Sequence, residues 1–253
     1  MPRDERPSGS RPTLTPSDGA ALTLLRDGEL QIVGLLPRAS NSTYLAKVRS
    51  GGDEALAVYK PRDGEAPLWD FPPGTLCRRE VAAYVVARSL GWPNVPPTVL
   101  RRGPEGPGSV QLFLEFDPNE HYFTLAERIP DEFRRVALFD AVVNNADRKS
   151  GHCLLGTDGE VFVIDHGVCF HETPKLRTVI WDFARENVPE AMLEDLRGLA
   201  RKLDARPDGE ELGGLLSARE IEATRGRLDR LIQQQRDTLR ETEKLRQEIE
   251  RSK

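Results

Sequence analysis

Two aspartates stand where a hydrophobic core has no need of a carboxylate. Asp147 lies in the polar stretch NNADRKSGH that follows an apolar helical run, and Asp165 directly follows the apolar run VFVI. The residues between them have the pattern of a β-hairpin, with TDGE at its turn. Two carboxylates placed in this way can divide the work of phosphoryl transfer, one facing the proton of an attacking hydroxyl and the other a divalent cation. Each loop taken alone is more typical of a helix cap or a turn.

A lysine and a glutamate earlier in the chain fit the same chemistry. Lys60 ends the strand-like run AVYK, and Glu80 lies in an apolar helical run further on. A lysine in this place can neutralise phosphate charge, and a glutamate on a neighbouring helix can hold it in an ion pair. Taken singly, each is more typical of a solvated strand end or an exposed helix face. The order of strand lysine, helix glutamate, loop aspartate and post-hairpin aspartate is more specific than any of its parts.

The elements that must position these residues form a strand-rich first half and a helical second half. In the first half, apolar periodicity and turn signals predict helices over 19–25 and 78–90 and strands over 29–36, 43–48, 55–59, 98–101 and 109–116. In the second half they predict helices over 133–143, 189–203 and 218 to about 251, with hairpin strands over 153–155 and 161–164. Asp131 is the expected cap of the helix over 133–143. The predicted fold class is therefore α+β.

Changes in composition divide the chain into four segments. A leader over 1–18 precedes a strand-rich lobe over 19–116, a mainly helical lobe over 117–206, and a linker with a long amphipathic helix over 207–253. The leader lacks the apolar stretch of a signal peptide, and no apolar run approaches the length of a membrane span. We therefore expect a cytoplasmic protein without a transmembrane segment.

The composition disfavours several classes of protein. The 253 residues carry a formal net charge of −5, which argues against binding to nucleic acid through phosphate neutralisation. The three cysteines, Cys77, Cys153 and Cys169, are odd in number and form no C-x-x-C motif. Neither a disulfide framework nor a structural zinc site is therefore expected. Hydrophobic residues at 38% fit one large domain or a compact two-lobed unit.

Several stretches resemble one family of kinases. NNADRKSGH followed by VIDHGVCF resembles the D-R-H-x-x-N and I-D-F-G signatures of the phosphatidylinositol 3- and 4-kinases, and is more distantly similar to the HipA-type kinases. VYKP, PLWDF, HYFTL, FDAVVNNADRK and KLRTVIW resemble the small actinobacterial proteins described as phosphatidylinositol-kinase-like, over about residues 30–203. This resemblance implies a two-lobed, protein-kinase-like fold that transfers the γ-phosphoryl group of ATP, with magnesium or manganese, to a hydroxyl acceptor.

The resemblance also implies roles for particular residues. Lys60 would touch the nucleotide phosphates, and Glu80 would pair with it. Asp147 would be the catalytic aspartate, Arg148 beside it a catalytic-loop cation, and Asp165 a metal ligand.

The loop expected to cover the phosphates departs from that of the protein kinases. It lies over 38–43, between the first two strands, and lacks the G-x-G motif. Ser40, Ser42 and backbone N–H groups would therefore have to hold the phosphates.

The catalytic loop departs from the family signature at two positions. His152 stands where the family has an asparagine as its second metal ligand, and Lys149 replaces the histidine of D-R-H. Imidazole suits manganese, zinc or iron better than magnesium, so ordinary two-magnesium catalysis is in question. His152 is then either a metal ligand or a brace for the loop. Lys149 either neutralises phosphate charge or faces water.

The acceptor is not defined by the resemblance. Lys175 and Arg177 are the lasting positive charges of the segment 166–181, so a protein or small-molecule hydroxyl is favoured over a lipid. Two other functions remain open. One is a nucleotide-binding pseudokinase that recruits a partner, and the other is a nucleotidyl transferase that moves AMP.

The tail from Ala218 carries an imperfect heptad of apolar residues. It is expected either to pack partly on its own domain or to pair with a second copy or another helical partner. Because every candidate site residue lies before Phe170, the sequence predicts that removing this tail leaves nucleotide binding unchanged.

Overall fold

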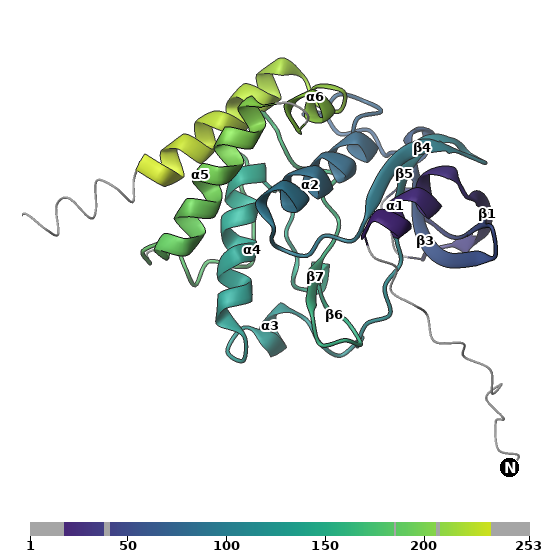
Figure 1. Ribbon diagram of the computed structural model, residues 1–253, viewed down its shortest axis with the longest axis horizontal. Coiled ribbons are helices and arrows are strands. Elements are labelled where there is room, and N and C mark those ends of the chain that lie inside the picture. The colour runs from purple at the N-terminus through teal and green to yellow at the C-terminus, as the bar shows by residue number, and fades with distance from the viewer. Residues whose placement is uncertain (1–17, 38–40, 185, 206–207, 234–253) are drawn as a thin grey trace, which may run out of the picture.

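The computed structural model describes residues 18–37, 41–184, 186–205 and 208–233. Its first half contains an antiparallel sheet of five strands in the order β1-β2-β3-β5-β4, with α1 packed against one face (Figure 1). The bounds are α1 Asp18–Asp27, β1 Glu29–Leu35, β2 Tyr44–Ser50, β3 Asp53–Pro61, β4 Thr98–Gly103 and β5 Gly106–Leu112.

Strand β3 places its two faces against different helices. Ala57 and Tyr59 are fully buried in the cluster that α1 makes with the sheet. Because side chains alternate along a strand, Lys60 points to the opposite face, where α2 (Leu76–Leu90) lies. The turn between β2 and β3 consists of Gly51 and Gly52 with φ of +57° and +98°, the backbone that a two-residue hairpin turn requires.

Helix α2 lies between the sheet and the helices of the second half. It contacts β4 and β5 on one side and two later helices on the other (Figure 1). Its first turn is closed by a carboxylate from the preceding loop, because Glu65 accepts hydrogen bonds from the N–H groups of Leu76 and Cys77 at 3.1 and 2.8 Å. Gly91, with φ of +90°, ends the helix. Both ends are therefore defined locally.

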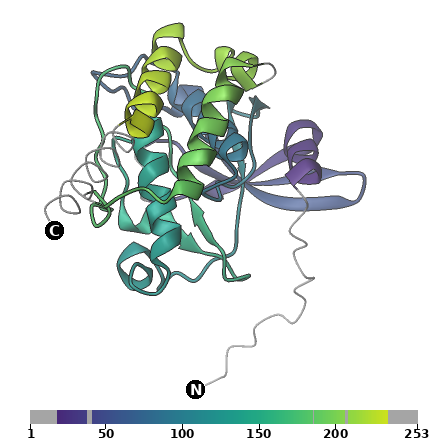
Figure 2. The same ribbon diagram turned by 60° about the vertical axis from the view of Figure 1, so that its left-hand side comes forward.

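The second half is helical, with one small hairpin. Figure 2 shows this half on one side of the molecule and the sheet with α1 on the other. A separate hydrophobic cluster fills it, which includes Phe133, Phe139, Leu196 and Leu228. The elements are α3 Tyr122–Leu125, α4 Pro130–Val143, β6 Cys153–Leu155, β7 Val161–Val163, α5 Glu190–Asp204, α6 Asp208–Gly213 and a helix over 218–233.

Most predicted elements are present, and the differences have local causes. Helix α4 begins at Pro130 with Ile129 as its N-cap, so the prediction of Asp131 as the cap is wrong. Proline suits the first helical position, and Asp131 instead places negative charge in the first turn. Helix α6 lies in the segment predicted as a linker, and α3 was not predicted, because such short helices carry little periodic signal.

The last helix begins where the sequence predicts. It is helical over 218–233, and the predicted continuation to about 251 lies outside the described residues. Leu228 is buried in the second-half cluster, and Arg225 donates to the carbonyl of Leu203 at the end of α5. Its described part therefore packs on its own chain.

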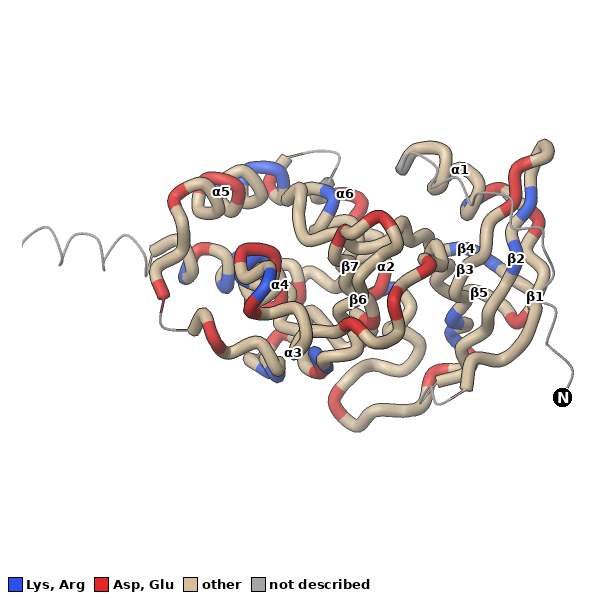
Figure 3. The backbone as a smooth tube through the Cα atoms, turned by 90° about the horizontal axis from the view of Figure 1, so that it is seen from below, with Lys and Arg blue, Asp and Glu red and all other residues tan. Residues whose placement is uncertain are grey.

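Acidic and basic residues are interspersed along the elements of both halves (Figure 3). On α5, Glu190 and Glu194 lie near the beginning and Arg201 and Lys202 near the end. This order matches the helix dipole, which favours negative charge at the N-terminus and positive charge at the C-terminus. The division into lobes over 19–116 and 117–206 stays a prediction.

Candidate active site

The structure brings together three of the residues singled out in the sequence. Lys60 Nζ lies 2.5 Å from Glu80 Oε1 and 3.0 Å from Asp165 Oδ1. Lys60 ends β3, Glu80 lies in the first turns of α2, and Asp165 follows β7. The site therefore joins the sheet to the helical half.

Glu80 binds on both of its oxygens. While Oε1 pairs with Lys60, Oε2 accepts a hydrogen bond of 2.9 Å from the backbone N–H of His166. The Glu80 side chain is only 5% exposed, so this carboxylate is held rather than solvated. It couples the position of the lysine to the backbone just after Asp165.

The charges of the site stabilise one another. Burial lowers the pKa of Lys60, but the carboxylates of Glu80 and Asp165 outweigh burial and hold that pKa above its usual range. Lys60 in turn holds the pKa of Asp165 well below its usual range, although burial opposes this. Both groups are therefore charged at neutral pH.

Asp165 remains accessible from the solvent. Its side chain is 50% exposed, and its backbone has φ of +66°. Aspartate tolerates this left-handed conformation better than most residues, and a sequence read as the end of a strand gives no sign of it.

The aspartate expected to be catalytic is also exposed. Asp147 has a side chain that is 42% exposed, and its carboxylate pairs with Lys149 Nζ at 2.9 Å. Its backbone N–H donates to the side-chain oxygen of Asn145 at 3.0 Å. Lys149 is 62% exposed and pairs with Asp147, a contact that neither expectation for Lys149 included; its contact with phosphate stays a prediction.

Arg148 is in a different position from the one predicted. Its guanidinium is fully buried and pairs with Asp140 at 2.8 Å, while it also donates to the carbonyl of Ile164 at 3.0 Å. Arginine is a donor only, so Nη2 at 2.8 Å must donate to Nε2 of His166. All these partners lie inside the protein. Arg148 therefore positions the loop and the turn after β7, which corrects its prediction as a catalytic cation.

His152 lies against the proposed metal ligand. Its Nε2 is 3.3 Å from Asp165 Oδ2, and its Nδ1 accepts from the N–H of Lys149 at 3.4 Å. Burial lowers the pKa of His152, with Asp165 opposing, so the neutral ring is favoured. The geometry is compatible with both readings, ligand and brace.

The residues present fit a metal held jointly with a ligand. The described part of the chain contains no cluster of three or more His, Cys, Asp or Glu side chains able to hold a metal. Asp165 and His152 supply one carboxylate and one imidazole, which is too few for a closed protein site. Magnesium and manganese on nucleotides are commonly held by one or two protein ligands plus phosphate oxygens.

The phosphate-covering loop is only partly described. Ser40 lies outside the described residues. The backbone N–H of Ser42 donates to the carbonyl of Gly64 at 2.9 Å, which ties this loop to the 3₁₀ turn over Arg62–Gly64. Contact of Ser42 with phosphate stays a prediction.

A buried polar network behind the loop that carries Asp147 was not predicted from the sequence. Asp140 on α4 is fully buried and accepts hydrogen bonds from Asn145 and Arg148, which lie in this loop on either side of Asp147. Asn144 ends α4 with φ of +55° and donates to the carbonyls of His171 and Thr173. The signal was present, because an aspartate inside the apolar run LFDAVV needs a buried partner.

The fold and the contacts of Lys60 define a kinase-like protein. A family model described as "Phosphatidylinositol 3- and 4-kinase" matches residues 98–199. Protein Rv2133c of Mycobacterium tuberculosis is 39% identical over 258 residues, covering 85% of this chain and 92% of that protein. The chain belongs to the small actinobacterial phosphatidylinositol 3-/4-kinase-like family.

Proteins that are more distantly similar to this chain are also described as kinases. Phosphatidylinositol 4-kinase gamma 4 of rice is 32% identical over 190 residues, and the chain spans about a third of its length (33%). The Golgi casein kinase with Mn/ADP bound has a TM-score of 0.56 at 14% identity, covering 86% of this chain and 75% of that one. The proinflammatory kinase CtkA of Helicobacter pylori has a TM-score of 0.50 at 14% identity, covering 82% and 92%. The solved structures show the kinase-like fold. None of the helices described here is long and apolar enough to cross a membrane.

Proposed function

We propose that this protein transfers the γ-phosphoryl group of ATP to a hydroxyl acceptor with magnesium or manganese. The observation that carries the proposal is the double contact of Lys60 Nζ with Glu80 and Asp165. In protein kinases this lysine–glutamate pair and the metal-binding aspartate must both be in place for catalysis. Here Lys60 pairs with Glu80, and Asp165, the residue that we propose as the metal ligand, lies beside this pair.

Each residue then has a defined task. Lys60 neutralises charge on the nucleotide phosphates, and Glu80 keeps it in place. Asp165, with His152, would hold the divalent cation, which would supply positive charge beside the phosphoryl group. Asp147 orients the acceptor hydroxyl and accepts its proton as the oxygen attacks the γ-phosphorus and the bond from that phosphorus to the departing ADP breaks.

The acceptor is better described as a protein or small-molecule hydroxyl than as a lipid. Of the two cations in the segment 166–181, Lys175 is already paired with Asp70 at 2.7 Å, and its ammonium lies 5.0 Å from the centre of the Trp69 ring. Because Asp70 already balances the charge of Lys175, this lysine would be attracted less strongly to an anionic membrane surface. The named activity of the plant relatives belongs to proteins about three times as long as the shared region.

Mass spectrometry of the full chain incubated with ATP and each metal tests the proposal. Phosphoryl transfer to the protein adds about 80 Da, whereas AMP transfer adds about 329 Da. We expect the smaller adduct, or ADP formation when an acceptor is supplied, and loss of both in Asp147→Asn with nucleotide binding retained. Nucleotide binding without turnover in either protein contradicts the proposal and supports the pseudokinase alternative.

A further inference from the structure

Arg79, the residue next to Glu80 on α2, is almost completely buried at 1% exposure. Its Nη1 donates to the carbonyl of Cys169 at 2.6 Å, and its Nη2 pairs with Glu220. The guanidinium carbon lies 4.8 Å from the centre of the Phe71 ring. The Arg79 side chain thus contacts both the segment after Asp165 and the last helix. Arg79 is also adjacent in sequence to Glu80, the partner of Lys60.

Hydrogen bonds at the beginning of its own helix hold the Glu220 carboxylate in place for this contact. Its second carboxylate oxygen accepts from the N–H and the hydroxyl of Ser217 at 2.8 and 2.9 Å, the arrangement of a helix capping box. Its side chain is 13% exposed. The beginning of the helix over 218–233 and the pair with Arg79 are therefore fixed by the same carboxylate.

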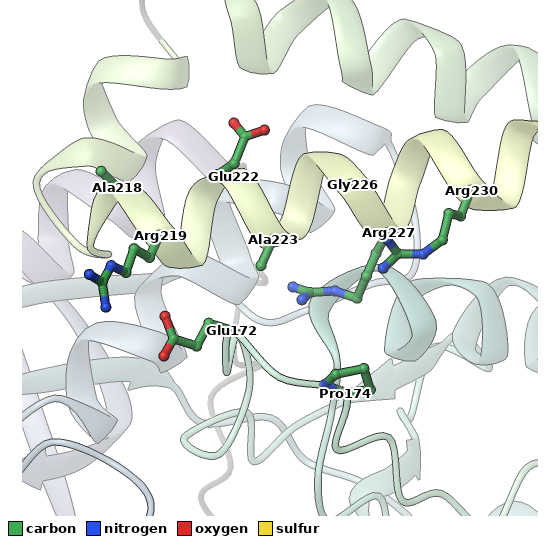
Figure 4. A pocket seen from close by; sticks show the side chains of 9 residues that line it. All are labelled: Glu172, Pro174, Ala218, Arg219, Glu222, Ala223, Gly226, Arg227 and Arg230. Atoms are coloured by element: carbon green, nitrogen blue, oxygen red, sulfur yellow. The ribbon is translucent and has the colours of Figure 1, made fainter.

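Arg227 makes a second connection two turns later. It donates from Nε to the carbonyl of Val142 at 2.8 Å and from Nη1 to the carbonyl of His171 at 3.2 Å. Figure 4 shows its side chain on the helix face turned toward the loop that carries Pro174. The ring of His171 contacts the backbone carbonyl of Asp70 at 2.9 Å. The segment 169–171 is thus held between the last helix and the loop before α2.

Both polar contacts and apolar packing join this helix to the segment after Asp165, since Leu228 is buried in the same cluster as Cys169 and Phe170. A groove of about 840 Å³ separates them where Ala223 and Gly226 leave space (Figure 4). Arg227 borders that groove and donates across it to the carbonyl of His171.

We infer that Glu220 and Arg227 are positioning residues of the active site, and that the last helix holds α2 and the segment after Asp165 in the arrangement that pairs Lys60 with Glu80. The inference rests on the proposed function and deepens it. It also reverses the expectation that the tail from Ala218 is dispensable for nucleotide binding.

Hydrogen exchange of Glu220→Gln in the full chain tests the inference without requiring turnover. The amide of His166 reports the arrangement directly, since it donates to Glu80. We expect faster exchange in the peptide covering 164–170 and an ATP dissociation constant raised about ten-fold, within the usual range of coupling between sites. Glu222→Gln is the matched control, because its side chain lies on the same helix and is 79% exposed.

Two results overturn the inference. One is unchanged exchange over 164–170 in Glu220→Gln, and the other is an increase spread evenly over the protein, which indicates general destabilisation. If Glu220→Gln does not fold, Arg227→Lys serves in its place, because lysine keeps the charge but cannot bind both carbonyls in the same way. Absence of ATP binding in the wild type contradicts the proposed function alone, since the exchange measurement still decides the role of Glu220.

Discussion

At the level of single residues, the site has one more negative than positive charge. Lys60 is shared between Glu80 and Asp165, and Asp165 also faces His152. Of the two carboxylates, Glu80 is enclosed and Asp165 is half exposed. A cation that approaches from solvent therefore meets Asp165, while Glu80 stays with the lysine.

Asp165→Asn tests this division. Asparagine tolerates the positive φ of +66°, so the fold should persist, but its neutral amide binds a divalent cation poorly. At a nucleotide concentration near 100 times the dissociation constant, the wild type should gain about 2.7 kcal/mol of stability from metal–ATP, and the variant much less. Thermal shift with and without metal measures this difference.

Asp158→Asn is the control for that measurement. Asp158 lies in the turn between β6 and β7 and accepts from the N–H of Glu160, a contact that asparagine can also make. It should behave as the wild type. An undiminished metal-dependent shift in Asp165→Asn would remove Asp165 from the metal site.

His152→Asn distinguishes a metal ligand from a brace. If the imidazole of His152 is a metal ligand, the variant should shift the metal preference of nucleotide binding from manganese toward magnesium. The expected shift is about ten-fold, the lower end of effects seen for residues around a metal. Calorimetric titration of ATP with each metal measures the ratio. An equal loss with both metals identifies His152 as a brace for the loop.

At the level of elements, α4 supports the loop that carries Asp147 through one buried carboxylate. Asp140 pairs with Arg148, and both side chains are fully buried. Arg148 in turn binds the carbonyl of Ile164 and the ring of His166. The loop with Asp147 and the turn with Asp165 are thus held from behind by the same ion pair.

Asp140→Asn should therefore be strongly destabilising. It leaves the buried guanidinium of Arg148 without its counter-charge, which typically costs about 3–5 kcal/mol. Urea denaturation at pH 7 measures the free energy of unfolding. Asp131→Asn is the control, because its carboxylate pairs with Arg134 at the surface with 75% exposure, where such pairs contribute about 0–1 kcal/mol. Similar small losses in both variants would contradict the role of Asp140.

At the level of the whole molecule, the pair of Arg79 and Glu220 joins α2, the segment after Asp165 and the last helix. Burial raises the pKa of Glu220, but the hydroxyl and N–H of Ser217 and the charge of Arg79 together bring that pKa below the ordinary 4.5. A carboxylate whose pKa is lowered by folding adds stability above the pKa of the unfolded chain. That stability is lost as the pH falls through the lower, folded value.

The pH dependence of Glu220→Gln follows from this sign. At pH 7 the variant should be less stable than the wild type by roughly 1.5–3 kcal/mol, the range for a hydrogen bond to a charged group. The difference should shrink as the pH falls below 4.5. Unfolding curves of both proteins over this range measure it. A difference that is independent of pH would show that the charge of Glu220 does not contribute.

The sequence by itself determined the elements and the chemical types of the site. Strand β3, helix α2 and the β6–β7 hairpin follow from local periodicity and turn residues, so Lys60, Glu80 and Asp165 were placed on the right elements. The order of these residues along the chain was informative because each side chain has one plausible task in phosphoryl transfer.

The pair of Lys60 and Glu80 was predicted from the sequence, but only the tertiary structure decided the partners of the other buried charges. Arg148 and Asp147 are adjacent in sequence, yet one guanidinium points inward to Asp140 while the neighbouring carboxylate faces solvent. Arg79 and Glu220 are 141 residues apart and form a buried pair. Such partners carry no periodic signal, since a buried charge is satisfied by whatever the packing of distant elements brings to it.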